Sequence, residues 1–403
     1  MAAARLTSVS RRVAATDAPC IVGMQAILRD CPRDVLSLAQ GIVHWSPPEQ
    51  ALARAERAVR LPQTSLYGAD GGDVELVEAL KAKLARENSI MNSDVMVTTG
   101  ANQAYANCVL ALTDAHEEVV LFRPYYFNHL MAHQMTGSAE HVRFGPTRPG
   151  TMQPDIDWLV NELDARNPAI KVVTLCNPCN PTGVVIERAD VERASEACAR
   201  NGATLILDNT YEYFLAPGHA HAAIEAPHVV NIFSFSKAYG LMGWRMGYIA
   251  YPAALGDALL KVQDTIPICP TRISQQAALG ALEAGRAWVD ERTAPLAANL
   301  AALRGALAPL PAVHGGEGAI YLLCELPPPL GAGSGCDESV MRWMAYRHGV
   351  AVIPGASCGA PGHFRVCYAN LAPDPFAVAV ERLSAAVSEL CSEGFTAARL
   401  TEY

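Results

Sequence analysis

The segment SFSKAYGLMGWRMG, residues 234–247, places Lys237 just past a predicted strand at 229–234 and eight residues before Arg245. The apolar residues of 229–233 are typical of a buried strand, so the lysine falls at the carboxyl end of that strand. Ligands bind at this edge of open α/β sheets. A buried lysine is unfavourable unless it is neutral, paired or covalently used. The segment therefore indicates either a binding site or a surface lysine in a glycine-rich loop.

Three more polar segments follow apolar runs of the same kind. They are NPCNPTG at 177–183, DNTY at 208–211 and GANQ at 100–103. The last of them also opens a predicted helix, 101–112, where free backbone N–H groups favour an anion. Each segment alone fits a plain turn or a helix cap. Because all of them end strands, as the lysine segment does, we expect them to lie together at one edge of a sheet.

Short apolar runs alternate with segments of helical length over most of the chain. The predicted strands are 95–98, 119–122, 171–175, 204–207, 229–234 and 247–251. Their nearly continuous apolarity indicates that both faces of each strand are buried, as in a mostly parallel sheet covered by helices. The predicted fold class is therefore α/β.

Beyond residue 286 the pattern changes. Helices are predicted at 295–307, 337–348 and 375–390, strand segments at 319–323 and near Val350 and Phe364, and a Pro/Gly loop at 327–335. We expect a large α/β domain of residues 51–285 and a smaller α+β domain of residues 286–403. The N-terminal residues 1–50 are expected to pack with the smaller domain.

Composition excludes several classes of protein. The 403 residues are 51% hydrophobic and 18% charged, with a formal net charge of −9, so neither nucleic acid nor an anionic membrane is an expected partner. The uncharged stretch 95–113 contains too many polar residues for a membrane helix. The twelve cysteines favour a reducing, cytoplasmic compartment, and the CxxC at 176–179 lacks further ligands for a metal site. The arginine-containing stretch 1–16 leaves organelle targeting as the alternative.

Taken together, these motifs resemble the fold-type-I pyridoxal-phosphate (PLP) enzymes of the class I/II aminotransferase family, over nearly the whole chain. Within that family, the plant aromatic aminotransferases are similar in four segments: SLAQGIVHW at 37–45, RPYYFN at 123–128, DNTYEY at 208–213 and GEGAIY at 316–321. Those enzymes pair methionine or aromatic amino acids with aromatic 2-oxo acids. The resemblance implies the PLP-dependent transferase fold and amino transfer to a 2-oxo acid such as phenylpyruvate or indole-3-pyruvate.

The resemblance also assigns roles at the cofactor. It implies that Lys237 forms the Schiff base with PLP and moves a proton between the substrate Cα and the cofactor. It implies that Asp208 pairs with the ring nitrogen, while Asn180 and Tyr211 hydrogen-bond the phenolic oxygen of the ring. The other implied cofactor contacts are the backbone at Ala101 and Asn102, the hydroxyls of Ser234 and Ser236, the charge of Arg245, the stacked ring of Tyr126, and Tyr67 from the neighbouring subunit of a homodimer.

Substrate contacts follow from the same resemblance. Arg365 matches the arginine that clamps the α-carboxylate, with Gly41 and Asn180 beside it, and a planar guanidinium suits bidentate binding. The expected slot for the substrate side chain is formed by Trp45, Tyr126, Tyr213 and Met242. For Trp45, ordinary core packing is the alternative. No second arginine matches a dicarboxylate site, which disfavours aspartate and glutamate as donors.

Other functions stay open on the sequence. A PLP lyase or synthase on the same scaffold, such as a cyclopropane-forming synthase or a carbon–sulfur lyase, shares the equivalents of Lys237, Asp208 and Arg365. A non-catalytic ligand-sensing domain of a transcription regulator is disfavoured by the acidic net charge and by the complete catalytic set. A nicotinamide-dependent dehydrogenase is disfavoured because no GxGxxG follows a predicted strand.

Overall fold

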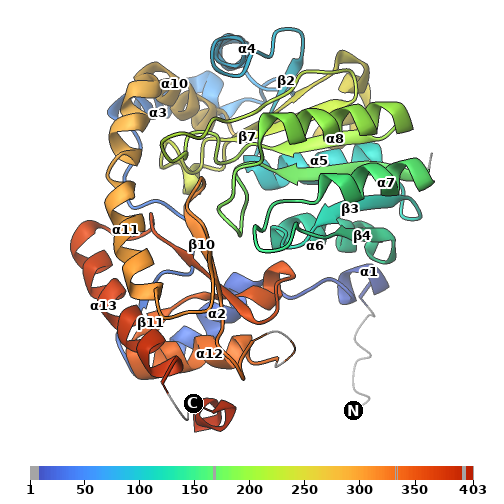
Figure 1. The fold of residues 1–403 in the computed structure, drawn as a ribbon. Coiled ribbons are helices and arrows are strands. Elements are labelled where there is room, and N and C mark those ends of the chain that lie inside the picture. The colour runs from blue at the N-terminus through green and yellow to red at the C-terminus, as the bar shows by residue number, and fades with distance from the viewer. Residues whose placement is uncertain (1–8, 167–168, 332, 334, 393–395, 403) are drawn as a thin grey trace, which may run out of the picture.

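The computed structural model describes residues 9–166, 169–331, 333, 335–392 and 396–402. Residues 1–8 of the predicted targeting stretch, and residues 332 and 334 of the predicted loop 327–335, lie outside these ranges. Figure 1 shows a large sheet with its helices in one part of the molecule and a smaller sheet in the other, where the C-terminal third of the chain lies.

The described part of the chain builds the large sheet from seven strands. They are β2 (Asp94–Thr98), β3 (Glu118–Phe122), β4 (Val142–Gly145), β5 (Ile170–Cys176), β6 (Thr204–Asp208), β7 (Val229–Ser234) and β8 (Gly247–Tyr251), in the order β2-β8-β7-β6-β5-β3-β4. Among these strands β8 is antiparallel to both β2 and β7, and the other six run in one direction. The predicted mostly parallel α/β sheet is confirmed, and the carboxyl ends of β2, β5, β6 and β7 share one edge.

The sequence prediction misses β4, the strand at the far edge of this sheet. It has four residues and pairs with β3 alone. Its Arg143 forms ion pairs with Glu118 at 3.5 Å and with Glu162 at 2.7 Å. Short edge strands with charged side chains are common because they discourage pairing with other chains. Such a strand has no continuous apolar run that would identify it.

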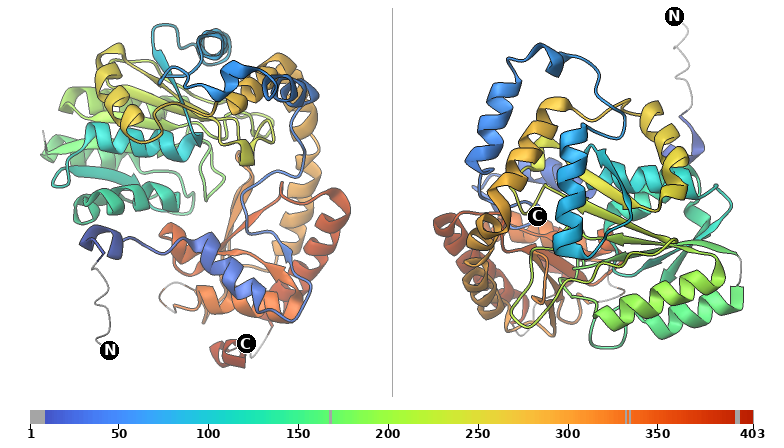
Figure 2. Two further views of the ribbon diagram at one scale, coloured as in Figure 1. Left: turned by 180° about the vertical axis from the view of Figure 1, so that it is seen from behind. Right: turned by 90° about the horizontal axis from the view of Figure 1, so that it is seen from above.

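Helices cover both faces of the sheet, because alternate residues of a strand point to opposite sides. In β5, Val172 packs with residues of α5 (Gly100–Leu112), α6 (Phe127–Thr136) and α9 (Gly256–Thr265). The next residue, Val173, packs with α7 (Ile156–Arg166) and α8 (Arg188–Asn201). Figure 2 shows these layers of helices on the two sides of the strands. Burial of both faces explains why the strands have nearly continuous apolar sequences.

The second sheet is antiparallel and follows the large one in the chain. Its order is β12 (Ile353–Pro354), β13 (His363–Cys367), β10 (Tyr321–Glu325) and β9 (Val313–Gly315), and its helices are α11 (Leu296–Leu307), α12 (Asp337–Trp343) and α13 (Pro373–Leu390). A π-helical turn, Met344–His348, completes the predicted helix 337–348. β1 (Leu36–Ser37) pairs in parallel with β11 (Val350–Ala351), which ties the N-terminal segment to this part. The domain division at residues 50 and 285 stays a prediction.

Helix α10 (Arg272–Thr293) runs between the two parts and packs along α3 (Glu49–Ala58). Gly280 permits this close approach, because a Cβ there would overlap the backbone of Gln50 and Ala51. The remaining helices are α1 (Arg11–Ala14), α2 (Cys20–Arg29) and α4 (Val74–Asn88), and short 3-10 turns lie at Pro62–Ser65, Ala139–His141, Met242–Trp244, Ala253–Leu255, Gly355–Cys358 and Ala397–Glu402. Over the described ranges, no helix is long and apolar enough to cross a membrane.

A buried ion pair joins α4 to the segment that follows β6. Lys83 and Glu212 are 2% and 8% exposed, and their Nζ and Oε1 atoms lie 2.5 Å apart. Asn88 accepts from Lys83 Nζ at 2.8 Å and donates to Glu212 Oε2 at 2.8 Å. Each buried charge therefore has both a counter-charge and a hydrogen bond, as burial requires.

Replacing Glu212 with Ala should lower the free energy of unfolding by about 3–5 kcal/mol, because Lys83 would stay buried without its counter-charge. The double variant Lys83→Met/Glu212→Leu should recover most of that loss, since neither charge remains. Urea unfolding followed by tryptophan fluorescence measures both. Lys81→Met is the control on the same helix, because its ion pairs are exposed and should change stability by less than about 1 kcal/mol. An equally small effect of Glu212→Ala would contradict this account.

Candidate active site

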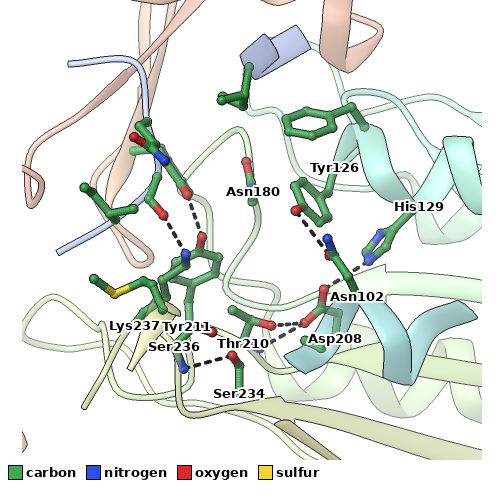
Figure 3. Close-up of a pocket in the computed structure, with 18 of the residues that line it drawn as sticks. Asn102, Tyr126, His129, Asn180, Asp208, Thr210, Tyr211, Ser234, Ser236 and Lys237 are labelled. Atoms are coloured by element: carbon green, nitrogen blue, oxygen red, sulfur yellow. Dashed lines mark hydrogen bonds and ion pairs between the residues drawn. The ribbon is translucent and has the colours of Figure 1, made fainter. Parts of the chain in front are cut away.

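A cavity of about 300 Å³ lies at the carboxyl edge of the large sheet, where residues from the second sheet and the N-terminal segment also reach (Figure 3). Most residues that the sequence predicts for the site line it: Gly41, Ala101, Asn102, Tyr126, Asn180, Asp208, Tyr211, Ser234, Ser236, Lys237, Met242, Arg245 and Arg365. They come from the ends of five strands (β2, β3, β5, β6 and β7) and the segments that follow them, from an early segment and from β13. The structure therefore brings together residues more than 300 positions apart in the sequence.

Lys237 follows β7 and points into the cavity, where its Nζ donates a hydrogen bond to Gly41 O at 2.6 Å. Burial, together with the positive charges of Arg245 and Arg365, lowers the pKa of this amine from 10.5 to about 8. At pH 7 Lys237 is therefore mostly protonated, and the neutral amine is a minor fraction that grows as the pH rises toward 8. A neutral amine can act as a nucleophile or as a base, whereas an ammonium cannot.

Asp208 ends β6, and its carboxylate is held on both oxygens. His129 Nε2 donates to Oδ2 at 3.0 Å, while the backbone N–H and the hydroxyl of Thr210 donate to Oδ1 at 3.0 and 2.6 Å. Burial alone would raise the pKa of Asp208, but the hydrogen bonds and charge from His129 and the bonds from Thr210 outweigh it and lower the pKa. Asp208 is thus a fixed negative charge on the floor of the cavity.

The beginning of α5 forms an anion-binding corner of the cavity. Gly100 has a φ of 78° and starts the helix, so the backbone N–H groups of its first turn are directed outward. A Cβ at residue 100 would overlap the guanidinium of Arg245, which packs against this turn. Ser234 and Ser236 add hydroxyls beside it. Helix N–H groups, hydroxyls and a guanidinium are the donors that a phosphate group requires.

Arg365 lies in β13 at the opposite side of the cavity and is 2% exposed. Its Nη1 donates to Asn180 Oδ1 at 2.7 Å and its Nη2 to Ala39 O at 2.9 Å. Its Nε is buried without a hydrogen-bond partner among the described residues. Within the described ranges no carboxylate pairs with this guanidinium, which is 4.3 Å above the ring of Tyr321, so an anionic ligand would complete its coordination.

Two tyrosines line the space between these charged groups. Tyr211 and Tyr321 share a hydrogen bond of 2.5 Å between their hydroxyls, and burial keeps the pKa of Tyr211 well above its ordinary value. Gly41 is necessary beside them, because a Cβ there would overlap the Tyr321 hydroxyl. Tyr126 lies against His129 in an edge-to-face contact, and its hydroxyl donates to Asn102 at 3.3 Å.

Three residues predicted for the site lie outside the cavity lining. Trp45 is packed in the core, where its ring stacks on Phe214 with centroids 6.3 Å apart and its Nε1 donates to Ala238 O at 3.2 Å. Tyr213 is also buried and donates to Glu87 at 2.6 Å. Tyr67 is 79% exposed on the surface. Of the residues expected to form the slot for the substrate side chain, Tyr126 and Met242 do line the cavity, and Ile21, Ile42 and Phe127 add further apolar wall.

Several lining residues were not expected from the sequence: Ile21, Gln40, Ile42, Phe127, His129, Thr210 and Tyr321. His129 lies three residues after Tyr126, one helical turn along α6, which is a usable signal once Tyr126 is placed. Thr210 lies between two predicted site residues, Asp208 and Tyr211. Nothing in the local sequence indicates that Ile21 reaches the cavity, because α2 is far along the chain from most of the other residues that line it.

The fold and the cavity define an α/β enzyme in which one cavity brings together a buried lysine, a helix N-terminus with an arginine beside it, and a buried arginine. The model of the family "Aminotransferase class I and II" matches residues 33–383. The chain therefore belongs to the class I and II aminotransferase family, and the predicted fold and enzyme class are confirmed.

Relatives agree over nearly the whole length. The chain is 46% identical over 391 residues to the aromatic aminotransferase ISS1 of Arabidopsis thaliana, covering 96% of this chain and 98% of that one. It is 30% identical over 391 residues to the aspartate/prephenate aminotransferase of Thermus thermophilus, covering 91% and 95%. Among solved structures, a tetra mutant of the Thermus thermophilus aspartate aminotransferase complexed with tryptophan has a TM-score of 0.84 and 27% identity, covering 94% and 100%.

The lowered pKa of Lys237 implies a stability penalty in the ligand-free protein. At pH 7 both the folded and the unfolded chain carry a protonated lysine, and the folded state holds it in the less favourable place. Lys237→Met should therefore raise the free energy of unfolding by about 1–3 kcal/mol at pH 7. The difference should shrink between pH 8 and 10.5, where the unfolded chain binds more protons and the wild type gains stability as the pH rises.

Urea unfolding of the ligand-free proteins at several pH values measures this difference. Lys261→Met, at an exposed lysine on α9, is the control for the loss of a lysine charge. A Lys237→Met protein that is less stable than wild type at pH 7 would show that the hydrogen bond to Gly41 outweighs the burial of the charge.

Proposed function

We propose that this aminotransferase uses PLP to transfer the amino group of an aromatic amino acid or methionine to a 2-oxo acid such as phenylpyruvate or indole-3-pyruvate. The observation that carries the proposal is the placement of Lys237 between the Gly100–Arg245 corner and the unpartnered Arg365 Nε. PLP is a phosphorylated aldehyde that reacts with an amino acid. It needs a site for its phosphate, an amine for its aldehyde, and a site for the carboxylate of the amino acid.

The donor set fits PLP. The first turn of α5 at Ala101 and Asn102, the hydroxyls of Ser234 and Ser236, and Arg245 would hold its phosphate. Asp208 would face the ring nitrogen, Tyr126 would cover the ring, and Asn180 and Tyr211 would lie at the phenolic oxygen. When bound, the cofactor supplies an electron sink for the pair that leaves the substrate Cα–H bond.

The chain's own residues then position the substrate and move the proton. The guanidinium of Arg365 binds the α-carboxylate and fixes the orientation of Cα, with the backbone of Gly41 alongside. Lys237 Nζ is neutral in part, because its pKa is about 8. It takes the proton from the substrate Cα and delivers it to the cofactor as the amino group is transferred. Asp208 keeps its negative charge beside the ring nitrogen, and Tyr211 stays protonated and donates a hydrogen bond.

The walls of the cavity favour an apolar substrate side chain. The cations of the described lining are Lys237, Arg245 and Arg365, and the roles above use all of them. No further cation of the described lining remains for a second carboxylate, whereas Ile21, Ile42, Phe127 and Met242 offer apolar surface. The aromatic aminotransferase from Arabidopsis thaliana and the tryptophan complex of the Thermus mutant support an aromatic side chain. The family match supports transfer rather than lyase or synthase chemistry.

A homodimer in the cytoplasm completes the proposal. Leu66, Tyr67, Ile266 and Ile268 are large apolar side chains that are 66%, 79%, 54% and 40% exposed. Their two segments lie together, because Gly68 N donates to Cys269 Sγ at 3.4 Å. A second subunit covering this patch would remove the apolar surface from water and bring Tyr67 to a neighbouring site.

The test is a half-reaction followed by visible absorption, with no oxo acid present. Phenylalanine, tryptophan or methionine should bleach the band of the bound cofactor, and phenylpyruvate should restore it, while aspartate should act much more weakly. A band that persists while ammonia, a thiol or a cyclised product appears would establish lyase or synthase chemistry instead. A protein that stays colourless after PLP is added would overturn the cofactor assignment.

Arg365→Ala should raise the KM for phenylalanine by about 100-fold, because a buried charge-assisted pair with the carboxylate is lost. The dissociation constant of PLP should change little, since Arg365 is not among the phosphate contacts. Steady-state kinetics and cofactor titration measure the two quantities separately. Arg188→Ala, on the exposed surface of α8, is the control. Equal losses of amino-acid and cofactor binding would place Arg365 in another role.

A further inference from the structure

The carboxylate of Asp208 is held by hydrogen bonds from two different residues. Its carboxylate accepts three within the described structure, one from His129 and two from Thr210. The shortest is the bond from the Thr210 hydroxyl, at 2.6 Å. Asp208 is 5% exposed, so water contributes little to holding this charge. The orientation and the ionisation of the carboxylate therefore depend on these donors.

The two bonds from Thr210 have different requirements. The backbone N–H of residue 210 bonds to the side chain two residues before it, which is an Asx turn that any residue other than proline can complete. The hydroxyl bond needs threonine or serine at this position. The side chain of Thr210 thus adds a contact that the turn itself does not demand, and it lines the cavity next to the carboxylate.

We propose that Thr210 is a positioning residue whose hydroxyl holds the Asp208 carboxylate ionised and oriented toward the ring nitrogen of the cofactor. This inference rests on the proposed function, because it needs a pyridine ring above Asp208. A carboxylate has about four acceptor positions, and three are occupied by His129 and Thr210. The remaining position is the one available to a ring N–H.

The charge balance at Asp208 explains why the hydroxyl matters. Burial raises the pKa of this carboxyl and the hydrogen bonds lower it, with the bonds from His129 and Thr210 prevailing. Without the hydroxyl, a proton shared between Asp208 and the ring nitrogen would move toward Asp208. The ring would then carry less positive charge and accept the electron pair from Cα less readily. The expected effect falls on kcat, because substrate binding uses Arg365 instead.

The experiment compares Thr210→Val and Thr210→Ser in the PLP-loaded enzyme. Thr210→Val removes the hydroxyl with little change in shape, and it should lower kcat for phenylalanine about tenfold or more while KM changes little. Thr210→Ser keeps the hydroxyl and should stay within about threefold of wild type. Thr182→Val is the matched control, because Thr182 is 1% exposed, is not among the residues that line the cavity, and accepts a 3.4 Å bond from Val184 N through its hydroxyl.

A second readout separates positioning from folding. The PLP dissociation constant of Thr210→Val should rise and the pH dependence of the cofactor absorption should shift, with Thr210→Ser restoring both. With a PLP analogue that has carbon in place of the ring nitrogen, wild type and Thr210→Val should have the same residual activity, since there is no ring nitrogen to serve.

Two results would overturn the inference while leaving the proposed function intact. One is a Thr210→Val enzyme with wild-type kcat and cofactor absorption. The other is the same activity loss with the carbon analogue as with PLP, which would show that the hydroxyl acts through the fold. Failure of the wild type itself to bind PLP would instead refute the proposed function.

Discussion

The buried guanidinium of Arg365 joins the three parts of the chain that make the site. It comes from β13, donates to Asn180 in the loop after β5, and donates to Ala39 in the segment after β1. A charge at 2% exposure is strongly unfavourable unless such partners surround it, so the three segments must arrive together. Arg365 lines the cavity, and its Nε is buried without a hydrogen-bond partner in the described structure, so the guanidinium is available to a carboxylate.

The opposite side of the cavity is organised by sheet topology. Because β2, β5, β6 and β7 run in the same direction, the turns after them deliver Gly100, Asn180, Asp208 and Lys237 to one edge. Opposite charges lie apart along this edge of the sheet. The positive charge of Arg245 lies beside Gly100. The negative charge of Asp208 is held by His129 and Thr210. Lys237 lies near two guanidiniums in this arrangement, and its lowered pKa follows from burial together with their charge.

The sequence predicts the parts of this design that local patterns encode. Buried parallel strands are continuously apolar, so their ends, and the polar residues after them, could be located in advance. Trp45 and Tyr213 were expected in the slot for the substrate side chain, because they are aromatic residues close to a motif. They lie outside the lining, where their polar atoms donate hydrogen bonds to Ala238 and Glu87. Ile21 could not be predicted, since only the tertiary path of the N-terminal segment brings α2 to the cavity.

Catalytic groups and substrate-selecting walls have separate structural origins in this molecule. The charged groups are fixed by strand direction and by hydrogen bonds, and replacing Asp208 or Arg365 leaves buried hydrogen-bonding partners unsatisfied. The walls formed by Ile21, Ile42, Phe127 and Met242 come from α2, a loop, α6 and a 3-10 turn, and their side chains are apolar. Apolar side chains tolerate exchange at a much smaller free-energy difference. Substrate preference can therefore diverge while the transfer chemistry is retained, consistent with relatives named for aromatic and for aspartate substrates on one fold.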